Sequence, residues 1–280
     1  MHRRPGFEII ARLGYVARGL VHVVVGGFAV LAAIAGERAV GTKGALQKLL
    51  TQPLGTALLC VVALGLLCFA AWRLAQCFLD ADHNGRGVNA IARRAFYGAN
   101  ALFYIGLAAW AGSLMFEWSG GPDNDQEARD WTAWLMAQPL GRMVVIGLGV
   151  AIAAVGLGVA AKGLTGSFER RLELSERLRR WLLPVGRYGH LARAAVFVII
   201  GGFLVAAALR YDAREALGLG GSLRVLQQQP YGWVLLALTA AGLLAFGTYQ
   251  FVEAAYRRVT APTVGQLSRE ARLQAQTSTH

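Results

Sequence analysis

The sequence is poor in charged residues, in cysteine and in recognisable catalytic motifs. Only 16% of its 280 residues are Asp, Glu, Lys or Arg, against about a quarter in soluble domains. Its three cysteines show no CxxC or Cys/His spacing of the kind that holds a metal. The chain also has no Ser/His/Asp arrangement, phosphate-binding loop, HExxH motif or pair of carboxylates within an apolar segment. We therefore expect no enzyme activity, no metal site and no cofactor.

The sequence contains several long apolar segments without charged residues. The chain is 55% hydrophobic, and its mean hydropathy is +0.44. Crossing the hydrocarbon core of a bilayer takes about 20 mostly apolar helical residues. The sequence therefore predicts an all-α integral membrane protein with six transmembrane helices, centred on residues 19–36, 54–72, 95–116, 143–161, 194–209 and 231–252.

The six segments are three copies of one unit. Residues 12–28 and 187–203 are identical at nine of seventeen positions and lie 175 positions apart. A weaker copy, aligned from Arg93, puts Ala99 where the other two have Arg18 and Arg193. Internal repeats of this kind predict three parallel two-helix repeats related by pseudo-threefold symmetry about the membrane normal.

A second motif, Gln-Pro-x-Gly, opens the second apolar segment of each copy, at residues 52–55, 138–141 and 229–232. We expect its proline in the first turn of the helix that follows, and a short interfacial helix before it at the outer surface. The prediction is one membrane domain, 1–280, with repeats 7–82, 88–165 and 184–258, a basic amphipathic cytoplasmic linker, 166–183, and a flexible tail, 259–280.

The positive charge is unevenly distributed. With six spans, 20 of the 28 Lys and Arg residues fall on the side of the two termini, whereas the 16 acids divide equally. Because Lys and Arg mark the cytoplasmic side, we expect a bacterial inner-membrane protein with both termini in the cytoplasm, in contact with the anionic inner leaflet. Topology accounts for the net charge of +12, so we expect no nucleic-acid partner. A partner membrane protein or a second copy of the chain stays open.

Two arginines lie inside predicted spans. Arg18 and Arg193 occupy the same repeat position, about 9 Å beyond the water boundary at 1.5 Å per residue. Such charges indicate a functional site, unless the side chains extend back to the headgroups; both interpretations stay open. Glu253 is a candidate ion-pair partner for either arginine. The candidate ligand-binding residues are Arg18, Arg193, Arg73, Glu253, Gln250 and Asn100.

Two further patterns are weaker. His22 and His190 could suggest haem, but in the repeat alignment they differ in depth by about 10 Å, which favours packed or hydrogen-bonded histidines over a ligand pair. The acidic residues 123–127 could suggest calcium, but the glycine and glutamate of a calcium loop are missing at its sixth and twelfth positions. A solvated loop is the simpler interpretation.

The repeat motifs resemble those of a bacterial membrane family, domain of unknown function 1206. The resemblance rests on residues 14–19 (GYVARG), 52–55 (QPLG) and 71–73 (AWR), and it extends from about residue 7 to residue 258. It implies six spans and supplies no activity. Two hypotheses follow: a small transporter, channel or ligand-binding protein with a polar cavity facing the cytoplasm, or a non-catalytic scaffold that packs against partner helices. An axis filled by apolar side chains would oppose transport.

Overall fold

The computed structural model describes residues 5–78, 87–115, 124–172 and 174–257. This part of the chain is almost entirely helical. The prediction of six spans is confirmed, since six helices are long and apolar enough to cross a membrane. They are α1 (Pro5–Ala35), α3 (Gly55–Phe78), α4 (Val88–Met115), α6 (Gly141–Thr165), α7 (Glu176–Arg210) and α9 (Gly232–Tyr256).

The short helices expected before each Gln-Pro-x-Gly motif are also present. They are α2 (Thr42–Leu50), α5 (Asn124–Met136) and α8 (Leu219–Gln227). Two 3-10 turns complete the described helical segments: η1 (Ser167–Arg171) and η2 (Ala213–Glu215).

The Gln-Pro-x-Gly motif forms a tight turn ahead of the long helix. The long helices begin at the motif's glycine, so the proline precedes the first turn, and our placement of it inside the helix was wrong. The residue after each proline is left-handed, with φ of 62° at Leu54, 61° at Leu140 and 58° at Tyr231. A side chain on the glycine would collide with the short helix, because an added Cβ at Gly141 would lie 1.7 Å from the Leu135 carbonyl oxygen. The motif therefore folds each short helix back onto its long one.

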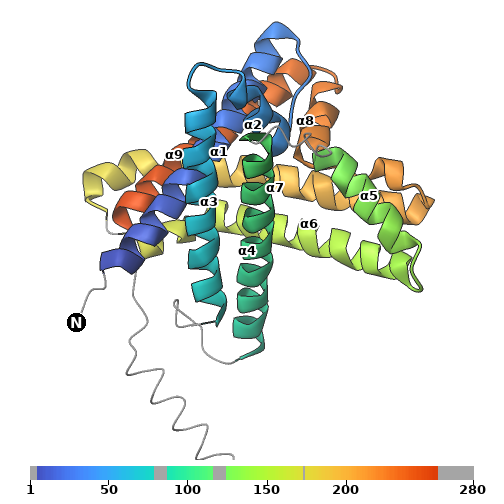
Figure 1. Cartoon of the computed structure of the whole chain (residues 1–280), viewed down its shortest axis with the longest axis horizontal. Coiled ribbons are helices and arrows are strands. Elements are labelled where there is room, and N and C mark those ends of the chain that lie inside the picture. The colour runs from blue at the N-terminus through green and yellow to red at the C-terminus, as the bar shows by residue number, and fades with distance from the viewer. Residues whose placement is uncertain (1–4, 79–86, 116–123, 173, 258–280) are drawn as a thin grey trace, which may run out of the picture.

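The long helices pack in the order α4, α3, α1, α9, α7, α6. Figure 1 shows three adjacent pairs that fan out in different directions, with α1 and α9 between the pair α3–α4 and the pair α6–α7. Each repeat supplies one helix to each of two pairs. In the first and third repeats the two helices of a repeat also touch each other, α1 with α3 and α7 with α9.

Glycine makes these two contacts within a repeat close. An added Cβ on Gly14 of α1 would lie 2.6 Å from the Cα of Phe69, and one on Gly189 of α7 would lie 2.5 Å from the backbone nitrogen of Phe246. Gly189 follows Gly14 by the 175 positions that separate the repeats. The first and third repeats thus pack their two long helices in the same way. We call the line along which the two long helices of one repeat face each other the seam of that repeat.

The middle repeat has no packed seam. Among the described residues, α4 and α6 form no packed interface. Only 17% of the most apolar window of α6 and 33% of that of α4 is buried, against 39–50% for the other four spans. The three-repeat layout is therefore present, but the ring of six helices is open between α4 and α6.

Burial also corrects the register of the middle repeat. Its buried positions follow those of α1 by 82 residues, not 81: Tyr97, Leu107, Ala108 and Ala111 correspond to Tyr15, Val25, Gly26 and Ala29. Because residues 93 and 94 are both arginine, sequence identity alone allows Arg12 to be aligned with either of them. Asn100, rather than Ala99, stands at the position of Arg18 and Arg193.

At the end of the bundle where α1, α4 and α7 finish, the three short helices form a cap. The Asp125 carboxylate of α5 accepts hydrogen bonds from the backbone nitrogens of Gly218 at 2.8 Å and Gly221 at 2.9 Å, and it pairs with Arg224 of α8. Lys43 of α2 pairs with Glu127 of α5. Residues 124–127 belong to α5 and Asp125 is only 4% exposed, so our interpretation of residues 123–127 as a solvated loop was wrong for 124–127; residue 123 lies outside the described residues.

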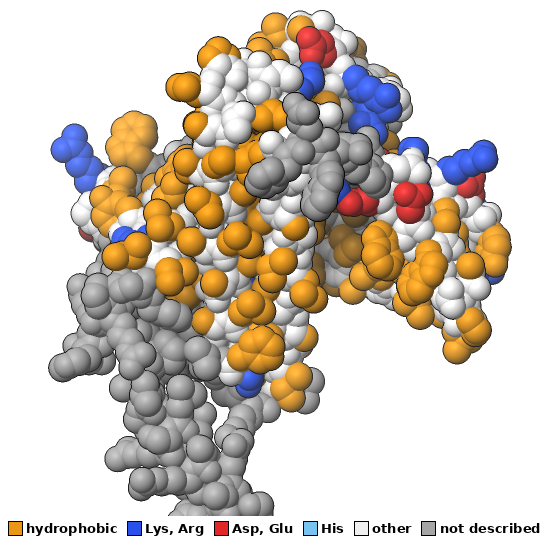
Figure 2. Space-filling view, in the orientation of Figure 1, with side chains coloured by type: hydrophobic (Ala, Val, Ile, Leu, Met, Phe, Trp, Pro, Cys, Tyr) orange, Lys and Arg blue, Asp and Glu red, His pale blue; other side chains and the backbone are white. Residues whose placement is uncertain are grey.

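A buried apolar cluster fills the bundle beneath the cap. It includes Val25 of α1, Leu59 and Leu66 of α3, and Leu236 and Leu243 of α9. Apolar side chains also cover much of the outer faces of α3 and α4, whereas Lys, Arg, Asp and Glu gather around the cap helices, as Figure 2 shows.

The linker is not one amphipathic helix. It consists of η1, an extended Leu172 bridged to Arg257, and the start of α7. Trp181 is 74% exposed, but Leu172 and Leu182 are buried and Phe168 stacks on His190 at 4.7 Å between ring centroids. The apolar side chains of the linker thus mostly turn toward the bundle. The predicted flexible tail, 259–280, lies outside the described residues.

Candidate arginine pocket

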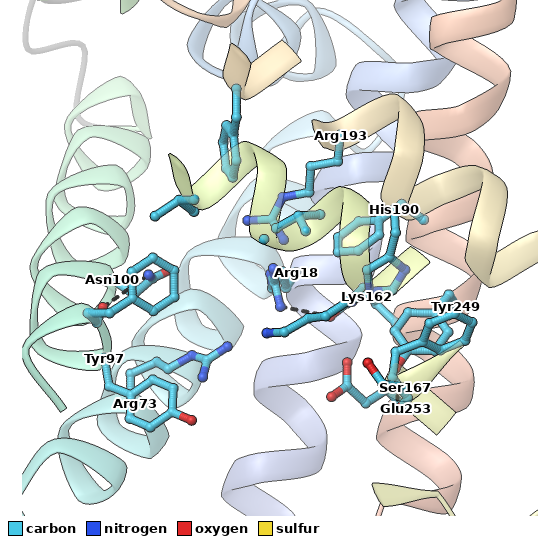
Figure 3. A pocket seen from close by; sticks show the side chains of 18 of the residues that line it. Arg18, Arg73, Tyr97, Asn100, Lys162, Ser167, His190, Arg193, Tyr249 and Glu253 are labelled. Carbon is cyan, nitrogen blue, oxygen red and sulfur yellow. Dashed lines mark hydrogen bonds between the residues drawn. The ribbon is translucent and has the colours of Figure 1, made fainter. Parts of the chain in front are cut away.

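A pocket of about 570 Å³ lies at the end of the bundle opposite the cap, where α1, α4 and α7 begin and α3, α6 and α9 end. All six spans and η1 contribute to its lining. Figure 3 shows Arg18, Arg73, Lys162 and Arg193 reaching into the same space from four different helices. Every candidate ligand-binding residue predicted from the sequence lines this pocket: Arg18, Arg73, Asn100, Arg193, Gln250 and Glu253.

Arg18 turns into the bundle. It is 5% exposed, and its Nε donates to the Tyr104 hydroxyl while Nη1 donates to the Gln250 side-chain oxygen, both at 3.0 Å. Its guanidinium carbon lies 5.1 Å from the ring centroid of Phe69. All these partners are neutral, so they orient the guanidinium without cancelling its charge. The side chain of Arg18 therefore does not extend back to the headgroups, which was one of the two interpretations left open by the sequence.

Arg193 is held by aromatic rings. Its guanidinium carbon lies 4.8 Å from the centroids of both Phe197 and Phe246. A cation over an aromatic face gains about 0.5–2 kcal/mol, but its charge remains available to an anion on the open side. Arg193 is half-buried.

Arg73 is the third deep arginine. It lies 4.8 Å from the centroid of Phe69 and 5.1 Å from that of Tyr97. Its Nη1 donates to the Gln76 side-chain oxygen at 2.8 Å, but its buried Nε has no hydrogen-bond partner. A buried donor left unsatisfied costs about 1–3 kcal/mol. Like Arg18 and Arg193, Arg73 is held against aromatic rings, and its charge is not cancelled by a described carboxylate.

The pocket is strongly cationic. Its charged lining residues are Arg18, Arg73, Arg93, Lys162, Arg193 and Arg257 against a single acid, Glu253. Glu253 pairs with Arg257, one helical turn away. Its predicted pairing with Arg18 or Arg193 was wrong, because Arg257, the first residue after α9, takes the place of that partner. Within the described chain, no carboxylate is paired with Arg18, Arg73 or Arg193.

The middle repeat contributes an amide to the site. Asn100 stands in the register of the deep arginines and donates to the Phe96 carbonyl oxygen at 3.1 Å. Its side-chain oxygen can still accept a hydrogen bond, and its neutral charge limits repulsion among the arginines around it.

Both histidines are hydrogen-bonded within their own helices. The Nδ1 of His22 lies 2.8 Å from the Arg18 carbonyl oxygen, and that of His190 lies 2.7 Å from the Gly186 carbonyl oxygen. This agrees with the prediction of packed, hydrogen-bonded histidines. His190 also lines the pocket.

Sequence reasoning missed three lining residues that lie outside the long helices, Ser167, Phe168 and Arg257. Phe168 of η1 stacks on His190, and Arg257 lies 5.0 Å from the ring centroid of Tyr15. Phe168 falls within residues 166–183, which the sequence predicted to be an amphipathic linker rather than part of a site. No local pattern marks Phe168 or Arg257, since both reach the site through contacts between distant segments.

The arrangement suits an anion that carries several oxygens. Guanidinium groups present planar sets of N–H donors that match carboxylate and phosphate geometry. Aromatic rings behind the guanidinium groups hold them in place and exclude water. None of the described His, Cys, Asp and Glu residues form a cluster of three or more that could hold a metal ion.

Comparison with known proteins agrees with the repeat structure. The model of a family described as Domain of Unknown Function (DUF1206) matches three tandem segments, residues 13–80, 95–166 and 188–257. The first two segments begin 82 positions apart and the first and third 175 apart, the same registers that burial indicates for α4 and repetition for α7.

The chain is also similar to "Uncharacterized protein YxxB" of Bacillus subtilis (strain 168). The two are 30% identical over 260 residues, which is 92% of this chain and 94% of that protein. No solved structure matches. With three matched segments and a relative of nearly its own length, this multi-pass membrane protein belongs to the DUF1206 family.

Proposed function

We propose that the protein is a non-enzymatic ligand-binding protein of the bacterial inner membrane, which holds an anionic group, phosphate or carboxylate, in the arginine pocket. One observation carries the proposal: Arg18, Arg73 and Arg193 converge on a pocket, and no described carboxylate is paired with them. Charge within a membrane span is costly and is kept where it functions. A bound anion would offset the repulsion among the three arginines.

The apolar core favours binding over a channel. The cluster of Val, Leu and Phe side chains occupies the bundle between the pocket and the cap, so the polar lining is confined to one end. The excess of Lys and Arg at that end supports a pocket on the cytoplasmic side, with both termini in the cytoplasm.

The test is a comparison of thermal unfolding in phosphate and in chloride, at equal ionic strength, for protein purified in an uncharged detergent. At ten times its dissociation constant, a ligand stabilises the folded state by about 1.4 kcal/mol, which raises the midpoint of a protein this large by about 3–6 °C. We expect this shift for the natural sequence and its loss in the double variant Arg73→Gln/Arg193→Gln.

The matched control is the double variant Arg177→Gln/Arg180→Gln. It removes the same charge from exposed positions of α7 outside the arginine pocket, and we expect it to keep the phosphate-dependent shift. A shift that is equal in both double variants, or absent from the natural sequence, would reject the anion site and favour a scaffold that packs against partner helices.

A further inference from the structure

The open seam of the middle repeat is a consequence of its sequence. In the register fixed by burial, Phe96 occupies the position of Gly14 and Gly189, where an added Cβ would already lie within 2.6 Å of the neighbouring helix backbone. On α6, the Gln-Pro-x-Gly register puts Ala151 at the position of Gly65 and Val155 at that of Phe69. The small residues and the aromatic ring that close the other two seams are thus replaced, and α4 cannot approach α6 in the same way.

The open seam of the middle repeat, between α4 and α6, is continuous with the arginine pocket. On α6, Val155, Gly158 and Lys162 line the pocket, and Ala151 and Gly147 continue the same helix face away from it. The opposite face of α6 is the one packed on α7, through Gly149 and other buried glycines. An added Cβ on Gly147 or Gly158 would meet nothing within 4 Å, so this face of α6 has room beside it.

The facing side of α4 is apolar and exposed. Phe96 and Asn100 line the pocket. Phe103 is 55% exposed, and an added Cβ on Gly106 would meet nothing within 4 Å. The seam therefore presents apolar surface from two helices, and its inner end opens onto cationic side chains.

We propose that the arginine pocket takes the headgroup of an anionic lipid from the surrounding leaflet, and that one acyl chain of this lipid lies in the seam between α4 and α6. This inference rests on the proposed anion site and names its ligand class. Length fits as well as charge. From Lys162 to Ala151 the helix rises about 16 Å, which is about half of the 30 Å hydrocarbon core, so a headgroup at the arginines places the chain in one leaflet.

The test is a titration of the purified protein with dioleoyl phosphatidate in mixed micelles of uncharged detergent, with bound lipid counted by native mass spectrometry. Dioleoyl phosphatidylcholine is the control lipid, and inorganic phosphate is the control without a chain. Ala151→Trp and, independently, Gly147→Phe would fill the seam. Val150→Trp is the matched control, because Val150 is 55% exposed on another face of α6.

We expect phosphatidate to bind at least ten-fold more tightly than phosphatidylcholine. Ala151→Trp and Gly147→Phe should each weaken phosphatidate binding at least five-fold without altering the phosphate-dependent thermal shift, and Val150→Trp should alter neither. If phosphate binds but the seam variants leave phosphatidate binding unchanged, the lipid inference is overturned and the anion site stands. If neither phosphate nor phosphatidate responds to Arg73→Gln/Arg193→Gln, the anion site fails as well.

Discussion

Alanine in place of Gly14 tests the packing of the seam. The added Cβ would lie 2.6 Å from the Cα and 2.7 Å from the nitrogen of Phe69. Because both are backbone atoms, α1 and α3 must move apart. Overpacking of this kind lowers the free energy of unfolding by about 1–3 kcal/mol. The higher helix propensity of alanine relative to glycine raises it by about 0.5–1 kcal/mol. Because the contacts at 2.5–2.7 Å are to backbone atoms, we take the upper part of the overpacking range, about 2–3 kcal/mol, and expect a net loss of about 1–2.5 kcal/mol for Gly14→Ala and for Gly189→Ala.

The assay is the thermal unfolding midpoint in detergent, where such a loss lowers the midpoint by about 2–10 °C. Gly27→Ala and Gly202→Ala are the controls, because an added Cβ at either would meet nothing within 4 Å; both should be neutral or slightly stabilising. Phe96→Ala, at the corresponding position of the open seam, should change stability by less than about 0.5 kcal/mol. If Gly14→Ala behaves like Gly27→Ala, the close seam, and with it the contrast to the middle repeat, is refuted.

Other predictions concern the cap, the turn and the charge of the pocket. Asp125→Ala leaves Arg224 without its carboxylate and should cost about 3–5 kcal/mol in unfolding free energy; a midpoint no lower than that of Asp130→Ala, on the exposed side of α5, would contradict a structural cap. Gly141→Ala should abolish the turn before α6, because its Cβ would lie 1.7 Å from a carbonyl oxygen; folded yield on gel filtration measures this, and normal yield would refute the explanation of the motif. Arg193→Met should raise the midpoint in chloride by relieving repulsion and lose the phosphate shift; a lower midpoint with the shift retained would contradict the role assigned to Arg193.

Periodicity and repetition were sufficient to predict most of the fold. The long apolar segments and the internal copies led to six spans in three repeats, with a short helix before each Gln-Pro-x-Gly motif. These features depend on local composition, which a sequence displays directly. The sequence also identified Arg18 and Arg193 as candidate site residues, because a charged residue within an apolar segment can be recognised without knowing where its side chain points.

Contacts between distant segments could not be predicted in the same way. A register error of one residue rotates a helix position by about 100°. The arginines at 93 and 94 allowed two alignments of the middle repeat, and only the burial of its side chains showed that Asn100 is the residue at the site. Asp125 of α5 pairs with Arg224 of α8, and this choice depends on how the two helices are rotated against each other. Glu253 pairs with the local Arg257, but the sequence did not show that α9 ends just before this arginine. The open seam likewise follows from a comparison of contacts in three repeats, which no single segment reveals.

The most direct measurement is the mass of the intact protein released from its membrane into an uncharged detergent, recorded by native mass spectrometry. The account predicts an anionic lipid retained by the natural sequence and by Arg177→Gln/Arg180→Gln, and lost from Arg73→Gln/Arg193→Gln. Equal retention by all three proteins, or an uncharged molecule in the place of the lipid, would contradict it.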